Sequence, residues 1–87
     1  MTIDRSTILL ADDDPTIADS LAPFLERSGF HVMVVSDGMS ALEKAQAHRP
    51  ELIILDVLMP RMDGREVLRR LRRANVWTPT ILLTQVG

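Results

Sequence analysis

The chain has 87 residues, of which 46% are hydrophobic and 25% charged, and its formal net charge at pH 7 is −2. This length predicts a single domain over residues 1–87. The slight acidity excludes a general attraction to nucleic acid, and the absence of cysteine excludes disulfides and thiolate metal sites. No apolar stretch approaches the ~18 residues of a membrane-spanning helix, and the polar start does not resemble a signal peptide. We therefore expect a cytoplasmic protein.

Strand-like and helix-like segments alternate from the start of the chain. The apolar run Thr7–Ala11 predicts a first strand. A helix is predicted over residues 15–27, with Asp14 placed to cap its first turn. Its apolar stripe consists of Ile17, Leu21, Phe24 and Leu25. Because Pro23 within this helix has no N–H to donate, we expect a kink or an early break there. His31–Val35 is rich in β-branched residues and predicts a second strand.

The alternation continues through the second half of the chain. After a turn at residues 36–38, helices are predicted over residues 39–48 and 65–74, and strands over residues 51–55 and 80–84. The expected order is therefore βαβαβαβ. Right-handed crossovers between parallel strands place helices on both faces of such a sheet, which is an α/β fold.

Carboxylates follow two of the predicted strands directly. Asp12 and Asp13 follow the first strand, and Asp56 follows the third. If these strands are neighbours, they lie about 4.8 Å apart, and ligands of open α/β sheets bind at this carboxyl edge. Clustered carboxylates repel one another, and oxygen donors suit Mg²⁺. Thr84 ends the fourth strand and adds a hydroxyl at the same edge, a set that suits phosphoryl transfer to an aspartate.

Four segments resemble response-regulator receiver domains, in the order in which that family has them. Residues 10–15, LADDDP, resemble the acidic pair after the first strand, and residues 55–64, LDVLMPRMDG, resemble the phosphoacceptor motif. Residues 36–42 resemble the start of the second helix, and residues 81–84, ILLT, resemble the strand that ends in a switch hydroxyl. The resemblance covers essentially the whole chain. It implies a flavodoxin-like, doubly wound parallel sheet with strand order 2-1-3-4.

The resemblance also implies a role for each residue of the acidic edge. Asp56 would accept a phosphoryl group from a phosphohistidine of a histidine kinase or phosphotransfer protein. Asp13 and Asp56 would ligate Mg²⁺ directly, together with the backbone carbonyl of Leu58, and Asp12 would act indirectly, through water or by contact with a direct ligand. Thr84 would move toward a phosphoryl oxygen. Such a domain is a regulatory phosphoacceptor rather than an enzyme, and it regulates an output outside this chain.

The family usually continues with a fourth helix, a fifth strand that bears a lysine, and a fifth helix. The sequence has no counterpart of these elements, and its only lysine, Lys44, lies in the predicted second helix. We therefore expect a receiver domain truncated after its fourth strand.

Two alternatives compete with this interpretation. Residues 12–16, DDDPT, also fit the Asp-x-Asp-x-Thr pattern of haloacid-dehalogenase-like phosphatases, but that function leaves Asp56 unexplained. The other alternative is an association-prone fragment, in which the unpaired edge of the fourth strand and an incompletely covered sheet face favour a homo-oligomer.

Six of the ten basic residues lie between Arg61 and Arg73. On the predicted helix, most of these arginines share the side opposite its apolar residues. This pattern indicates either a solvated helix face or a surface for an acidic partner. No aromatic residue lies among the arginines, so we expect no direct binding of nucleic acid. Trp77 is expected to pack in the loop before the fourth strand.

Overall fold

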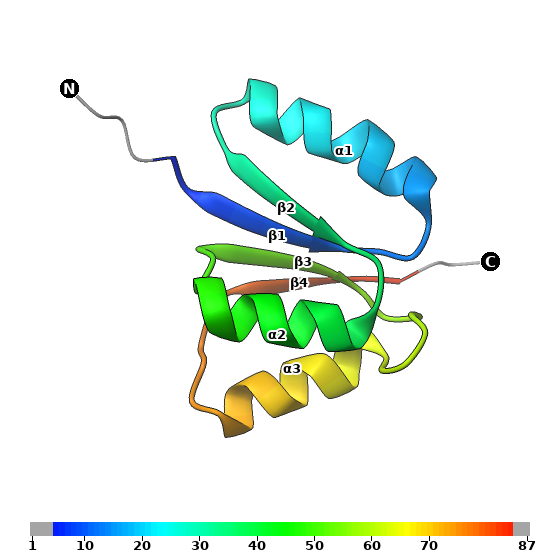
Figure 1. Cartoon of the computed structure of the whole chain (residues 1–87), viewed down its shortest axis with the longest axis vertical. Helices are drawn as coiled ribbons and strands as arrows, with labels where there is room; N and C mark the ends of the chain where they lie inside the picture. Colours follow the sequence, from blue (N-terminus) through cyan, green and yellow to red (C-terminus); the bar gives the residue numbers. More distant parts are fainter. Residues whose placement is uncertain (1–4, 85–87) are drawn as a thin grey trace.

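The structure is a computed structural model, and it describes residues 5–84. Strands and helices alternate in the predicted order (Figure 1). The strands are β1 (Thr7–Ala11), β2 (His31–Val35), β3 (Leu52–Asp56) and β4 (Thr80–Leu83). The helices are α1 (Pro15–Arg27), α2 (Gly38–His48) and α3 (Gly64–Arg73). The strands form one parallel sheet in the order β2-β1-β3-β4, which confirms the predicted fold class and strand order.

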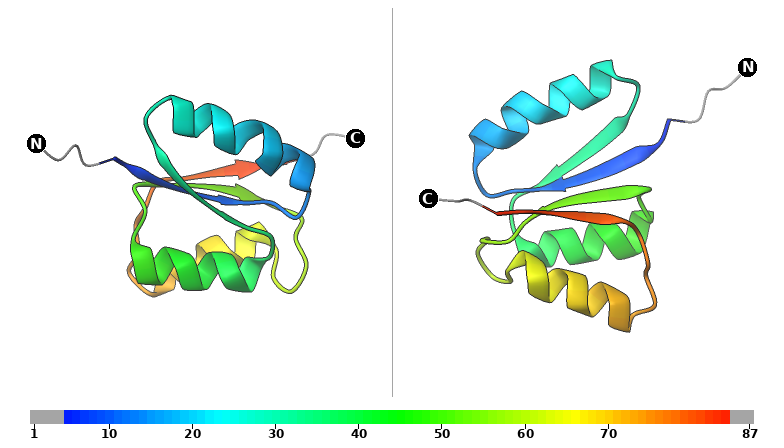
Figure 2. Two further views of the ribbon diagram at one scale, coloured as in Figure 1. Left: turned by 45° about the horizontal axis from the view of Figure 1, so that its top comes forward. Right: turned by 180° about the vertical axis from the view of Figure 1, so that it is seen from behind.

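The sheet separates two layers of helices. Helix α1 lies on one face, and α2 and α3 lie side by side on the other (Figures 1 and 2). Between the sheet and α2 and α3 is the larger core, which includes Leu9, Ile53, Leu55, Val67 and Leu71. A smaller core lies under α1 and contains Ile8, Leu10, Ala18, Ala22 and Ile54. The central strands β1 and β3 are therefore buried on both faces, as a parallel sheet requires.

Each helix begins at an aspartate that caps its first turn. The capping residues are Asp14, Asp37 and Asp63. Each side chain accepts a backbone N–H from two or three residues further along the chain, at 2.8–3.0 Å. These N–H groups are the largest cause that lowers the pKa of the Asp37 and Asp63 carboxyls below its usual value. The caps fix where each helix starts relative to the strand before it.

Helix α1 differs from its prediction in two ways. Its bounds are those predicted, and it continues through Pro23 to Arg27, so of the expected kink or early break the break is wrong. Pro23 is exposed, and the carbonyl four residues earlier can therefore bond to water instead. The predicted apolar stripe is also wrong in part, because Ile17 and Phe24 are 36% and 56% exposed while Ala18 and Ala22 are buried. The small residues let α1 pack closely on the sheet.

Helix α3 turns its arginines outward, while Trp77 departs from its prediction. Val67 and Leu71 are fully buried against the sheet, on the side opposite the exposed arginines. Trp77 is predicted to pack in the loop before β4, but it is 68% exposed and contacts the guanidinium of Arg72 instead.

Among the described residues, no helix has both the length and the hydrophobicity needed to cross a bilayer.

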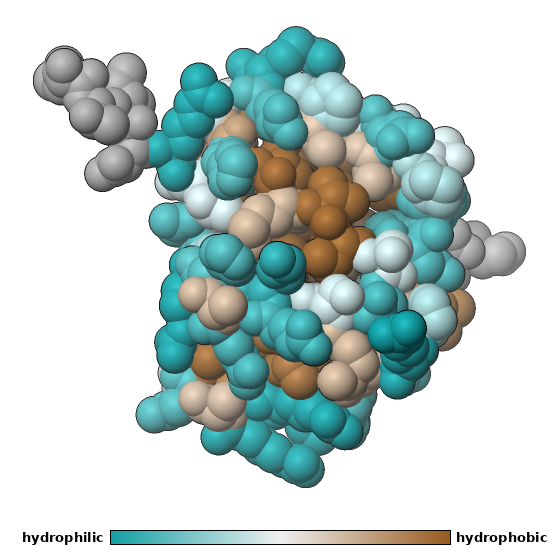
Figure 3. All heavy atoms as spheres, viewed as in Figure 1, coloured by the Kyte–Doolittle hydropathy of each residue, from teal (hydrophilic) through white to brown (hydrophobic). Residues whose placement is uncertain are grey.

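Both edges of the sheet expose apolar side chains. Figure 3 shows hydrophobic surface between α1 and α2. In the edge strand β2, Val34 is 48% exposed. At the other edge, Ile81 of β4 is 49% exposed although its register partner Ile54 is buried under α1. The right view of Figure 2 shows β4 at the near edge of the sheet, away from α1. Within residues 5–84, β4 pairs with β3 alone.

Candidate functional site

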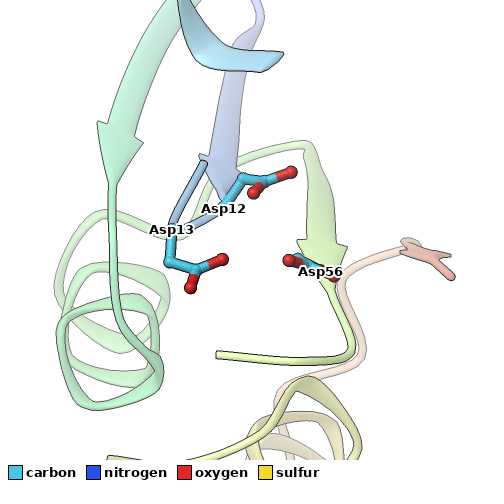
Figure 4. A group of neighbouring side chains, drawn as sticks. All are labelled: Asp12, Asp13 and Asp56. Carbon is cyan, nitrogen blue, oxygen red and sulfur yellow. The ribbon is translucent and has the colours of Figure 1, made fainter. Parts of the chain in front are cut away.

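Three carboxylates meet where β1 and β3 end. Asp12 and Asp13 follow β1 directly, and Asp56 is the last residue of β3. One carboxylate oxygen from each lies within 4.8 Å of the others, and Figure 4 shows Asp13 and Asp56 facing each other across the space between the two strand ends. Asp12 and Asp56 are only 6% and 5% exposed, whereas Asp13 is exposed. The structure thus brings together the three acids that the sequence places at this edge.

Backbone N–H groups hold the two buried carboxylates in place. The N–H of Asp14 donates to Oδ1 of Asp12 at 2.8 Å, and the N–H of Leu58 donates to Oδ1 of Asp56 at 3.2 Å. The N–H of Asp12 donates to the carbonyl of Val35 on β2 at 3.1 Å, which extends the sheet bonding to the acidic residue itself. The two carboxylates are therefore oriented by the backbone before any ligand arrives.

The negative charges of the three carboxylates repel one another. Burial is the largest cause that raises the pKa of the Asp56 carboxyl, and the charges of Asp12 and Asp13 raise it further, while the Leu58 N–H opposes the shift. A cation at this point relieves the repulsion. All the side-chain donors are oxygens, which fits a hard ion such as Mg²⁺ that also keeps water and phosphate oxygens as ligands.

Helix α3 begins directly against the end of β3. The N–H of Gly64 donates to the carbonyl of Val57 at 2.8 Å. A Cβ built at Gly64 would lie 2.3 Å from the carbonyl oxygen of Asp56, so only glycine fits there. Gly64 ends the motif of residues 55–64, and the motif alone does not predict this contact. Glycine disfavours a helix, yet it occupies the first helical position after the capping Asp63. A glycine at such a position indicates that the backbone closely approaches another segment there.

The loop between β3 and α3 also contacts the start of α2. The carbonyl of Pro60 accepts the N–H of Met62 at 2.8 Å and that of Gly38 at 3.4 Å. Arg61 between Pro60 and Met62 has φ of 70°, which makes this a tight three-residue turn. A Cβ at Gly38 would lie 2.0 Å from the carbonyl oxygen of Met62, so glycine is also required at the start of α2.

Two further predicted residues lie beside the acids but outside their cluster. Thr84 follows β4 directly and is exposed, so the strand ends one residue earlier than predicted. Its predecessor Leu83 is in register with Asp56, which places Thr84 at the same edge of the sheet. Leu58 is 65% exposed next to the site. Lys44 is exposed on α2.

Comparison with known proteins identifies the family. The family model of the response regulator receiver domain matches residues 8–87. The alkaline phosphatase synthesis transcriptional regulatory protein PhoP of Bacillus subtilis is 46% identical over 77 residues, which are 88% of this chain and 32% of that protein. The probable transcriptional regulatory protein TcrX of Mycobacterium tuberculosis is 38% identical over 78 residues, covering 90% of this chain and 33% of that protein. The chain thus spans about a third of the length of these curated relatives.

Solved structures give the same result for the fold. The receiver domain of the Francisella response regulator 1452 superposes with a TM-score of 0.90 at 34% identity, covering 95% of this chain and 69% of that one. The chemotaxis response regulator CheY4 of Vibrio cholerae superposes with a TM-score of 0.89 at 34% identity, covering 97% and 72%. With its sheet order and its acidic strand ends, the chain belongs to the response regulator receiver domains of two-component systems.

Proposed function

We propose that Asp56 is the phosphoacceptor of this receiver domain and that a phosphohistidine of a histidine kinase or phosphotransfer protein is the donor. The observation that carries this proposal is the position of Asp56. It is the last residue of a central strand, it is buried, and it lies within 4.8 Å of two other carboxylates. A carboxylate held by a backbone N–H at a sheet edge is placed to act as a nucleophile.

In the proposed reaction, the phosphoryl group moves from a nitrogen of the donor imidazole to a carboxylate oxygen of Asp56. A carboxylate oxygen of Asp56 attacks the phosphorus, the P–N bond to the donor imidazole breaks, and the imidazole nitrogen keeps the electron pair and takes up a proton. The product is an acyl phosphate on Asp56, which water later hydrolyses to inorganic phosphate and the free carboxylate. Because the phosphoryl group is stored on the chain itself, the domain acts as a regulatory switch for an output outside this chain rather than as an enzyme.

The neighbouring residues have supporting roles in this proposal. Asp13 and Asp56, with the carbonyl of Leu58, would hold Mg²⁺, and Asp12 would contribute indirectly. The ion, when bound, neutralises the carboxylates and the transferring oxygens. The hydroxyl of Thr84 donates to a phosphoryl oxygen. Support comes from the oxygen-only donor set of the cluster and from the position of Thr84 at the same edge of the sheet.

Acetyl phosphate with Mg²⁺ tests the proposal, with intact-mass spectrometry as the readout. We expect one phosphoryl adduct on the wild type and none on Asp56→Asn. Asp19→Asn, which removes an exposed carboxylate from α1, is the matched control and should keep the adduct. Leaving out Mg²⁺ should abolish it. A wild type that binds Mg²⁺ by calorimetry but forms no adduct would contradict phosphorylation of this chain.

We also infer that the chain associates with itself through the edge of β4. Two observations support this: β4 has β3 as its only partner within the described residues, and Ile81 on its α1 side is 49% exposed. An open strand edge beside an exposed apolar side chain favours pairing with a second copy. No observation favours the phosphatase alternative, since its pattern gives no role to the buried Asp56.

A further inference from the structure

The exposed side of α3 carries a row of arginines. Arg65, Arg69 and Arg73 are all exposed and recur every fourth residue, while Val67 and Leu71 on the opposite side are buried. With a rise of about 1.5 Å per residue, this spacing places one guanidinium about every 6 Å along the helix. The row is therefore a line of positive charge that winds slowly around one side of the helix with a regular repeat.

The charge of this segment is opposite to that of the remaining chain. Residues 61–73 contain six arginines and two acids, a net charge of +4, whereas the other residues contain four basic and ten acidic groups, a net charge of −6. Glu66 forms ion pairs with Arg69 and Arg70. Arg65 and Arg73 form no ion pair within residues 5–84. The guanidinium groups at the two ends of the row are thus free of ion pairs within the described part of the chain.

The only tryptophan follows the helix that carries this row, and two neighbouring residues hold it in a fixed orientation. Trp77 is 68% exposed, its Nε1–H donates to Oδ1 of Asn75 at 2.9 Å, and the guanidinium of Arg72 lies 5.4 Å from its ring centroid. Arg72 is itself fixed, because its N–H groups donate to the carbonyls of Val76 at 2.8 Å and Thr78 at 3.0 Å. Tryptophan and arginine are the residue types that dominate binding energy at protein interfaces, and a prearranged side chain loses little entropy on binding.

We propose that this surface binds an acidic segment of a partner protein. We define the α3–Trp77 surface by Arg65, Arg69, Arg72, Arg73 and Trp77. Carboxylates four residues apart on a helix, or two apart on a strand, repeat every 6–7 Å or so and match the arginine row. An apolar side chain of the same segment covers the indole ring. The partner is therefore an acidic segment with an apolar residue at one end.

The location of the surface makes this interaction independent of the acidic site. Helix α3 leads from the carboxyl ends of the strands back to the start of β4 (Figure 1). Trp77 lies in the connection just before β4, whereas Asp56 is the last residue of β3, so the two residues belong to opposite ends of the strands. Nucleic acid fits less well, because the row is short, only one aromatic residue belongs to this surface, and the rest of the chain is acidic.

Fluorescence of Trp77, the sole tryptophan, reports on binding directly. The probe is a helical peptide with glutamate at every fourth position and one leucine, and the control peptide has glutamine in place of glutamate. We expect the acidic peptide to shift the emission of Trp77 and the glutamine peptide to leave it unchanged. Raising the salt concentration should weaken the binding, since exposed ion pairs are screened.

Variants with matched charge make the test specific. Arg65→Gln with Arg73→Gln should weaken binding about fivefold, whereas Arg27→Gln with Arg49→Gln should change it less than about twofold. Trp77→Ala, measured by calorimetry, should also weaken binding, and far-UV circular dichroism checks that each variant is folded. Equal losses in the two arginine pairs, equal binding of both peptides, or tighter binding of a DNA duplex than of the acidic peptide would overturn the proposal.

Discussion

Gly64 lies against the backbone carbonyl of Asp56, so closely that a Cβ at position 64 would be 2.3 Å from the carbonyl oxygen. The N–H of the same glycine donates to the carbonyl of Val57 at 2.8 Å. The first turn of α3 and the end of β3 are therefore packed backbone to backbone. The residue at position 64 sets how far the helix stands from the acidic site.

Replacing Gly64 by alanine should be costly, because the atoms that would clash belong to the backbone and cannot rotate away. We expect Gly64→Ala to lower the free energy of unfolding by about 2–3 kcal/mol. Gly29→Ala is the matched control: Gly29 has φ of 102° but no atom within 4 Å of a built Cβ, so only backbone strain of about 1 kcal/mol is added. Urea denaturation measures both, and equal losses would contradict the close-packing argument.

Removing the charge of Asp56 should stabilise the metal-free domain. Burial and the carboxylates of Asp12 and Asp13 raise the pKa of the Asp56 carboxyl above its ordinary 3.8. The folded state therefore binds the proton more tightly than the unfolded state, and the ionised group costs stability at neutral pH. We expect Asp56→Asn to raise the free energy of unfolding by about 1 kcal/mol at pH 7, measured in chelator.

The stabilities of the wild type and of Asp56→Asn, measured as functions of pH and of Mg²⁺, check this prediction. The advantage of Asp56→Asn should be constant above the raised pKa, shrink as the pH falls through it, and vanish below 3.8. Mg²⁺ should raise the melting temperature of the wild type and not that of the variant. A variant less stable than the wild type in chelator would show that repulsion among the acids is unimportant.

Ionised Asp63, which caps α3, should stabilise the folded domain at neutral pH, whereas ionised Asp56 destabilises it. The N–H of Glu66 is the largest cause that lowers the pKa of Asp63 below 3.8. Its ionised form therefore adds stability that is complete above 3.8 and is lost as the pH falls through the lowered pKa. Asp63→Asn keeps a capping side chain but no charge. We expect Asp63→Asn to have a lower melting temperature than the wild type at neutral pH, and this difference should disappear at acidic pH. The control Asp19→Asn, at an exposed residue, should lower the melting temperature less.

A charge at the edge of β4 should prevent self-association. Lysine on an edge strand opposes pairing with another copy, so light scattering should detect oligomers for the wild type and monomers for Ile81→Lys. Val34→Lys places the same charge on the other edge strand, at a residue of nearly equal exposure, and should leave the oligomer intact. A wild type that stays a monodisperse monomer at high concentration would rule out the association.

Features that depend on local sequence were predictable. The aspartate caps and the apolar strands act over a few residues, and the strand order follows from the family, so the elements match within about one residue at their ends. The meeting of Asp12, Asp13 and Asp56 also follows, because carboxyl ends of adjacent parallel strands share one edge. The roles of these residues and of Thr84 in phosphoryl transfer stay predictions.

Features that depend on packing between distant segments were not predictable. That α1 continues through Pro23 without a break depends on which side of the helix faces water. That Ala18 is buried while Ile17 is exposed depends on how closely α1 approaches the sheet. The exposure of Trp77 depends on Arg72, whose hydrogen bonds to two loop carbonyls are visible only in three dimensions. Periodicity describes one element at a time and carries none of this information.

The carbonyl of Pro60 joins two parts of the molecule that are far apart in the chain. It accepts one N–H from its own loop, at Met62, and one from Gly38 at the start of α2. If the loop after Asp56 shifts, the longer of these bonds, to Gly38 at 3.4 Å, is the first to break. The amide proton of Gly38 would then exchange with solvent sooner, so hydrogen exchange at this glycine would report movement of a loop in which it does not lie.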